Sequence, residues 1–307
     1  MKNHIGDVKS IKFIILTNFI FLFLFISAYF TNINILDYDT SKLNGMNLKL
    51  IVMFLLAEPH FAMTIPMLWG YRSLLKSKNI IFLKIPILII LVSVSLYILS
   101  PILFSAVFLI ANVYHVNRQS LGFLKLQSKG AIEYGVGYEC ALHIFAIIVV
   151  MNLYLNIITG LIISVVFFTI FCIIFLSIIF KAYNAKFTFQ GLCSILQGFL
   201  IFFPVLVIDD LLLAFAVGIS IHYVQYLFIS WKLCYNSFGI SALQLLIFIT
   251  VYSILATGML SINILDNSLT FLIIIPTTLQ LLHFYFDSFI WRRADPLIRE
   301  TLRKAKI

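Results

Sequence analysis

The sequence predicts an all-α fold: a polytopic transmembrane helical bundle of about ten spans with both termini cytoplasmic. The first observation behind this prediction is composition. Of the 307 residues, 62% are hydrophobic and only 11% are charged, unlike any soluble globular domain. The second is that the apolar runs are continuous and about 20 residues long, as helices that cross a bilayer require. The third is the distribution of basic residues between the runs.

The apolar runs are taken in chain order. The first is expected to anchor the chain rather than to be cleaved as a signal peptide, because no small-residue cleavage site follows it. Tight joins near Ser100, Asn156 and Asp209 separate neighbouring runs. No loop is long enough for a soluble domain, so we expect a single integral membrane domain over residues 1–307. The predicted spans are 11–30, 48–71, 80–99, 101–117, 138–155, 157–180, 188–208, 211–231, 243–262 and 269–291.

Basic residues support this count and give the orientation. With the N-terminus inside, 19 of the 21 Lys and Arg residues fall on the cytoplasmic side, and only Lys42 and Lys49 fall outside. Such a bias in short loops is the positive-inside pattern of multi-pass membrane proteins. The same bias accounts for the net charge of +9, so nucleic acid is not expected as a partner. We expect the chain in a membrane, and the bacterial inner membrane fits it best.

Histidines are concentrated inside the predicted spans. All but His4 lie in or at the edge of a span, and counting about 1.5 Å per residue places each between the midplane and the cytoplasmic surface. A histidine in a bilayer is costly unless it pairs, binds a metal ion or lines a watery cavity. The candidate metal ligands are His60, His115, His143, His222 and His283.

Carboxylates and amides accompany these histidines at helical spacing. Asp287 follows His283 by four residues, on the same helical face. Such groups fix the tautomer and orientation of imidazoles that bind a metal. We therefore assign Glu58 and Asp287 as catalytic or ligating carboxylates. The expected orienting residues are Glu139, Gln225 and Gln280, and the expected binders of a polar substrate head are Arg118 and Gln119.

Plainer interpretations of single residues stay open. Each histidine can be a helix–helix hydrogen-bonding residue. Asp287 can pair with Arg292 or Arg293, and Glu58 can be a neutral buried acid beside the bend that Pro59 introduces. Tyrosines, Tyr223 and Tyr226 among them, are expected to serve packing.

The histidine pattern resembles the Brp/Blh group of membrane β-carotene dioxygenases. The resemblance rests on Pro59-His60, Tyr114-His115, the polar patch at His222, and His283 in the last span. It implies a polytopic helical fold with an iron site built from histidines on several spans. The chain departs from that group in lacking a glycine after Pro59-His60 and paired histidines within one span, and in having more spans. Retinal formation is therefore not carried over, and other segments look like those of uncharacterised bacterial membrane proteins.

The leading functional hypothesis is an integral membrane metalloenzyme. It would be a non-haem iron oxygenase, hydroxylase or desaturase that acts on a membrane lipid or another lipophilic small molecule. A di-iron centre is one option, and zinc and copper also suit imidazole and carboxylate ligands. One alternative is a proton- or ion-coupled secondary transporter that uses Glu58, His60 and His222. The other is a non-catalytic membrane assembly protein.

Overall fold

A computed structural model gives the structure of the chain. It describes residues 16–28, 48, 50–72, 80–127, 143, 200–201, 203–206, 208, 211–265, 271–292 and 295–305. Every element within these residues is helical, and they contain no strand. The predicted all-α class is therefore confirmed for the part of the chain that the structure describes.

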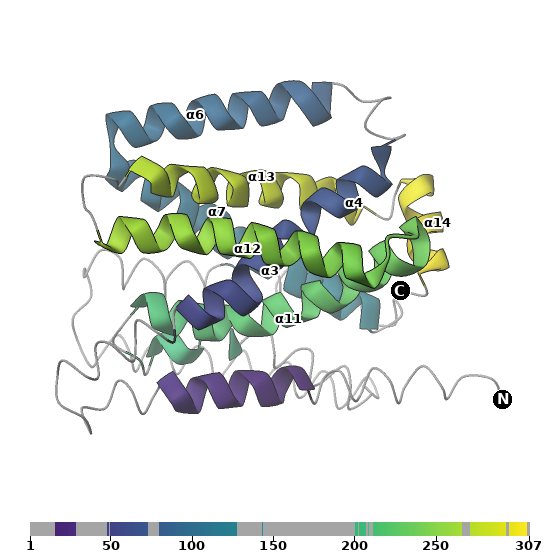
Figure 1. The fold of residues 1–307 in the computed structure, drawn as a ribbon, viewed down its shortest axis with the longest axis horizontal. Helices are drawn as coiled ribbons and strands as arrows, with labels where there is room; N and C mark the ends of the chain where they lie inside the picture. Colours follow the sequence, from purple (N-terminus) through teal and green to yellow (C-terminus); the bar gives the residue numbers. More distant parts are fainter. Residues whose placement is uncertain are drawn as a thin grey trace. The chain divides into compact units, whose positions relative to one another are not determined.

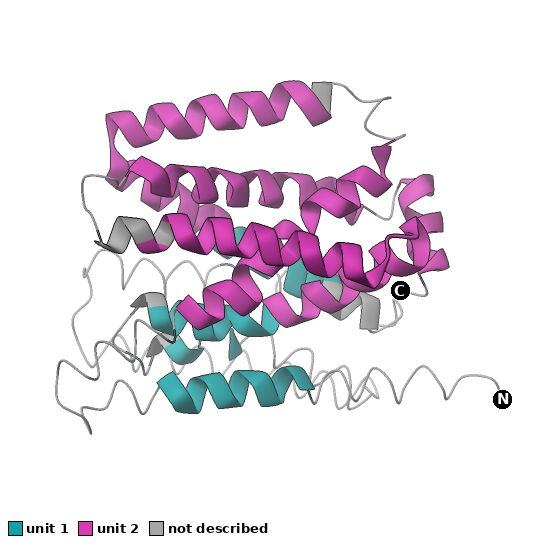
Figure 2. Cartoon of the chain, viewed as in Figure 1, with its two compact units in different colours: residues 1–49, 113–222 teal, residues 50–112, 223–307 magenta. Residues whose placement is uncertain are grey.

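The chain divides into two compact units, coloured separately in Figure 2. Unit 1 comprises Met1–Lys49 and Val113–His222, and unit 2 comprises Leu50–Asn112 and Tyr223–Ile307. In unit 1, helix Leu16–Ala28 packs Phe25 against Phe203 of η3 (Phe203–Leu206), with 5.8 Å between the ring centroids. Two long helices contribute to both units: α7 (Pro101–Gln127) and α11 (Leu211–Phe238).

Unit 2 holds most of the described helices. In Figure 1, α6 (Ile85–Leu99), α13 (Ile274–Ile290) and α12 (Ala242–Leu265) run side by side. Two short helices, α3 (Glu58–Ala62) and α4 (Thr64–Gly70), pack against α12 and α13 respectively. The apolar side chains of α6 and α12 are largely exposed, as expected for helix faces that meet lipid.

Five helical stretches in the described residues are long and apolar enough to cross a membrane. They match the predicted spans 48–71, 80–99, 211–231, 243–262 and 269–291. Helix Leu16–Ala28, within span 11–30, is shorter, and span 101–117 lies within α7, which is not one of the five. Spans 138–155, 157–180 and 188–208 fall almost wholly outside the described residues, so the total of ten stays a prediction. The five stretches are Leu50–Gly70, Phe82–Leu99, Leu213–Phe238, Ala242–Met259 and Phe271–Ile290.

The stretch Leu50–Gly70 is not a uniform α-helix. A π-helical turn, η1 (Met53–Ala57), precedes α3, and the N–H of Glu58 bonds to the carbonyl of Met53, five residues back. Pro59 comes next and has no N–H to give to residue 55, so the ordinary helical pattern cannot continue there. A second π turn, η2 (Ile80–Lys84), likewise precedes Pro86 in α6. The bend predicted at Pro59 therefore takes the form of a widened turn.

A tight connection joins α11 to α12. Gly239 has φ of 69°, which only glycine adopts readily, and the N–H of Ile240 bonds back to the carbonyl of Cys234 at 3.2 Å. Ser241 then starts α12 with reciprocal bonds: its N–H donates to Gln244 Oε1 at 3.0 Å, and its Oγ accepts from the N–H of Gln244 at 3.3 Å. The end of α11 and the start of α12 are therefore set by local backbone and side-chain hydrogen bonds.

A buried apolar cluster closes one end of unit 2. The last helix, α14 (Pro296–Lys304), turns Ile298 and Leu302 into it, while Arg299 and Arg303 stay exposed. The hydroxyl of Ser237 in α11 donates to the carbonyl of Thr301 at 2.9 Å. The cluster also contains Met63 and Met67, and so fixes the positions of α3 and α4 next to the histidines described below.

Candidate metal centre

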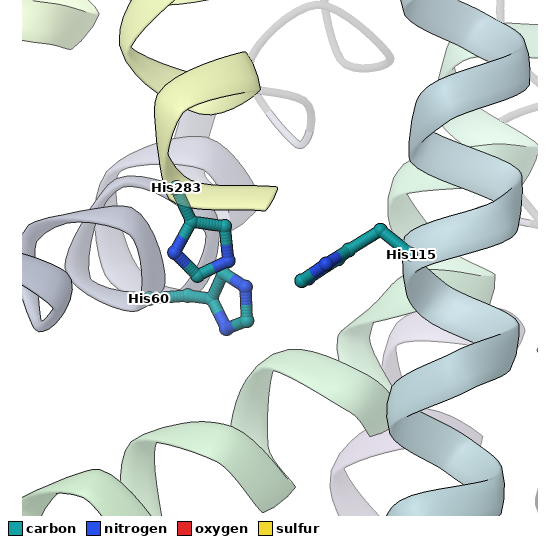
Figure 3. A group of neighbouring side chains, drawn as sticks. All are labelled: His60, His115 and His283. Carbon is teal, nitrogen blue, oxygen red and sulfur yellow. The ribbon is translucent and has the colours of Figure 1, made fainter. Parts of the chain in front are cut away.

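Two of the predicted ligands, His60 and His283, lie against each other inside unit 2. His60 stands on α3 and His283 on α13, and both are almost fully buried. Their ring centroids are 4.5 Å apart at an interplanar angle of 65°. Figure 3 shows the two imidazoles approaching from different helices. The sequence pattern therefore identified two histidines that do meet.

Asp287 lies beside His283, one turn further along α13. Its Oδ2 is 3.6 Å from Nε2 of His283, and its Oδ1 accepts a 2.7 Å hydrogen bond from the hydroxyl of Tyr226 in α11. The carboxylate is 4% exposed. The shared face predicted for His283 and Asp287 thus faces into the bundle, not toward lipid.

Thr64 and Tyr226 belong to the site, although the sequence did not assign them to it. Oγ1 of Thr64 lies 2.5 Å from Nδ1 of His283 and 3.5 Å from the hydroxyl of Tyr226. The expectation that Tyr226 serves only packing is incomplete, because its hydroxyl joins the polar contacts. Thr64 follows His60 by four residues, the same spacing as between His283 and Asp287. This spacing places Thr64 on the helical face of His60, so the sequence did contain a signal for Thr64.

Aromatic rings surround these polar groups. The ring of His60 is 4.1 Å from that of Tyr226 and 5.0 Å from that of Tyr223, and Phe61 lies 5.1 Å from His283. Such walls limit access of water and lower the local dielectric constant. Charge–charge interactions inside are therefore stronger than in water.

Glu58 opens α3 and is fully buried. Neither of its carboxylate oxygens has a hydrogen-bond partner among the described residues. An isolated buried carboxylate is costly, so the group needs a proton, a cation or water. The structure thus places Glu58 in unit 2, two residues from His60.

Unit 1 holds a second pair of predicted ligands. His115 on α7 and His222 on α11 are both buried, with ring centroids 5.5 Å apart and rings nearly perpendicular. His143 lies 5.4 Å, centroid to centroid, from Tyr114 of α7. Figure 3 also labels His115, which stands on α7.

The other residues predicted for the site differ in how far they are buried. Gln225 is buried on α11 and Gln280 is half-buried on α13. On α7, Arg118 is exposed and Gln119 is half-buried. Glu139 lies outside the described residues.

Imidazole nitrogens and a buried carboxylate are a typical ligand set for a transition-metal ion. Helical proteins build such centres from side chains on facing helices, and His60 and His283 likewise stand on two different helices, α3 and α13. Comparison of the chain with protein-family models, with characterised proteins and with solved structures finds no match.

Proposed function

We propose that the chain is an integral membrane metalloenzyme, a metal-dependent oxidoreductase acting on a lipophilic substrate. The observation that carries the proposal is the buried group of His60, His283 and Asp287 in unit 2. His60 and His283 are proposed as metal ligands. His115, His143 and His222 stay predicted ligands on the sequence alone.

The surroundings of the group favour a substrate that arrives from the bilayer. The helical stretches that carry His60 and His283, Leu50–Gly70 and Phe271–Ile290, are apolar and long enough to cross a membrane. A hydrophobic molecule reaches such a site through lipid, whereas a charged one would have to leave water at high cost. Arg118 and Gln119 are proposed to bind a polar substrate head. Non-haem iron is the proposed metal, since oxygenases, hydroxylases and desaturases of lipids need a redox-active ion.

Metal analysis of the detergent-solubilised full-length protein tests the proposal. We expect about one or two equivalents of iron, lost in His60→Ala and in His283→Ala but kept in His4→Ala, a histidine outside the predicted spans. Retained metal in both site variants would remove the pair from the metal centre. Stoichiometric zinc without iron would contradict the oxidoreductase assignment, because zinc has no redox chemistry.

Glu58 supports a second candidate, a proton-coupled transporter. A buried carboxyl group with no hydrogen-bond partner in the described residues suits a group that takes up and releases protons. In proteoliposomes, a pH gradient would then drive substrate uptake in wild-type protein and not in Glu58→Gln. An iron-containing protein with no such flux would leave the enzyme as the sole candidate. A non-catalytic assembly protein would show neither property.

A further inference from the structure

Unit 2 contains buried side-chain oxygens that no hydrogen bond satisfies. Both carboxylate oxygens of Glu58 on α3 and the hydroxyl of Ser253 on α12 lack a hydrogen-bond partner in the part of the chain that the structure describes. Glu58 is 0% exposed and Ser253 is 1% exposed. Buried polar groups are nearly always hydrogen-bonded, so these oxygens require an explanation.

Glu58 and Ser253 belong to elements that pack against each other. Helix α12 contacts both η1 and α3, and Figure 1 shows α3 beside the middle of α12. The side chain of Glu58 also interacts electrostatically with that of Tyr252, the residue before Ser253. The two residues therefore stand on one packed pair of helices.

The register of this packing places the two residues at nearly the same depth. Leu245 near the start of α12 and Met67 in α4 both belong to the buried apolar cluster at the end of unit 2. Ser253 follows Leu245 by eight residues, and Glu58 precedes Met67 by nine. At about 1.5 Å per residue, Ser253 and Glu58 lie about 12 Å and 13.5 Å from the level of that cluster.

The π turn before Glu58 adds a backbone oxygen. In an α-helix the carbonyl of Phe54 would accept from the N–H of Glu58, but that N–H bonds to Met53 instead. The next residue, Pro59, has no N–H to offer. Helix carbonyls point toward the C-terminal end, so the oxygen of Phe54 is directed toward the turn that carries Glu58. Carbonyls freed in this way at broken membrane helices are groups that bind Na⁺.

A cation satisfies these oxygens better than a proton does. A proton on Glu58 would remove the charge, but the new O–H would have no acceptor and the other oxygen no donor. A metal cation contacts several oxygens at once, and oxygen atoms are the ligands that hard cations prefer. A single carboxylate balances one positive charge, so a monovalent ion leaves no net charge buried.

We infer that Glu58 and Ser253, together with the carbonyl of Phe54, bind Na⁺ between α3 and α12. The ligands are all oxygens, so the site differs in chemistry from the imidazole centre proposed at His60 and His283. The inference goes beyond the proposed function and does not depend on it, because it uses another ion and none of the proposed iron ligands.

Sodium binding to the purified full-length protein in detergent tests the inference. Radioactive Na⁺ bound to the protein and the melting temperature are measured as choline chloride is replaced by NaCl at constant ionic strength. We expect saturable binding and a melting temperature that rises with the logarithm of the Na⁺ concentration, because an ion that binds only the folded state stabilises it. Glu58→Gln, which keeps the shape and removes the charge, should lose both effects. Ser253→Ala should weaken Na⁺ binding about 10- to 100-fold, as for one lost contact to a charged group.

Two control variants remove the same chemical groups elsewhere. Glu300→Gln removes a carboxylate of α14 that pairs with Arg303. Ser230→Ala removes a buried hydroxyl of α11 that already donates to the carbonyl of Tyr226 at 2.6 Å. Both variants should bind Na⁺ as the wild type does. In choline chloride, Glu58→Gln should melt at or above the wild-type temperature, since no charge is left buried, and this result shows that the variant folds.

The opposite outcomes are equally clear. A wild-type protein that binds no Na⁺ and melts at the same temperature in NaCl and in choline chloride would overturn the inference. Wild-type Na⁺ affinity in Glu58→Gln or in Ser253→Ala would overturn the assignment of the ligands to these two helices.

Discussion

At the residue scale, Gly70 is fixed by a single neighbour. A Cβ atom added to Gly70 at the end of α4 would overlap the ring of Phe238 at the end of α11. That ring is also packed edge-on against Tyr71, with 4.9 Å between centroids. The close approach of these two helix ends therefore requires glycine.

Gly70→Ala is expected to destabilise the protein by about 1–3 kcal/mol, the usual effect of overpacking a buried contact. Thermal unfolding in detergent measures the change. Gly258→Ala is the matched control, because a Cβ there meets nothing within 4 Å. The control should be neutral or stabilising by up to about 1 kcal/mol, since alanine is the better helix former. Equal stability of the two variants would contradict the contact between Gly70 and Phe238.

The sequence identified the histidines and Asp287 of the candidate centre but not the hydroxyls that hold them. Charge and imidazole are conspicuous in an apolar span, so His60, His283 and Asp287 stand out without any structure. A threonine or a tyrosine does not, because both are common on packed and lipid-facing surfaces. The role of Tyr226 depends on how α11 is rotated against α13, which periodicity does not supply.

At the element scale, α14 depends on its first residue. The side chain of Asp295 accepts hydrogen bonds from the N–H groups of Leu297 at 3.0 Å and Ile298 at 3.5 Å. These are donors that the helix itself leaves unpaired, and the negative charge also suits the helix N-terminus. Because α14 carries Ile298 and Leu302 into the apolar cluster, the cap supports packing as well as the helix.

Asp295→Ala is expected to lower stability by about 0.5–2 kcal/mol, the range found for lost N-caps. In this variant the backbone amides of residues 297–302 should exchange hydrogen faster than in the wild type, while the exchange rates of α11 should change less. Asp295→Asn, which keeps a side-chain acceptor, should change little. Unaltered exchange in Asp295→Ala would show that packing alone holds α14.

Helices were predictable where the apolar runs were long, and their internal form was not. The five spans found in the described residues match predicted ones because length and composition are sufficient to recognise them. The π turns before Pro59 and Pro86 were not foreseen. A proline in the sequence indicates that one backbone hydrogen bond of the helix is lost. The packing of neighbouring helices then decides whether the helix kinks or forms a wider π turn.

At the scale of the whole molecule, the placement of basic residues predicts one orientation in the membrane. An impermeant maleimide applied to intact cells should label a cysteine introduced at Asn44. It should label one introduced at Lys304 only after the membrane is opened. Positive charge is retained on the cytoplasmic side during insertion, which is the physical reason for this expectation. Labelling of both positions from the same side would end the ten-span arrangement.

The association of α3, α4, α11 and α13 around the histidines could not be derived from the sequence. Helices in lipid associate through close packing and hydrogen bonds rather than through the hydrophobic effect, since lipid is as apolar as the helices. Apolar patterning therefore shows which segments enter the membrane and says little about which faces meet.

The widened turn at Met53–Ala57 also bears on how this chain can change in length. Removing a residue from an ordinary α-helix rotates everything beyond the gap by about 100°, which carries buried side chains to the wrong face. A π turn already contains one residue more than an α turn, so losing one there restores the common pitch and leaves both flanking segments facing as before. Within this span, Met53–Ala57 is accordingly the segment where one residue can be deleted while His60 keeps its orientation in the bundle.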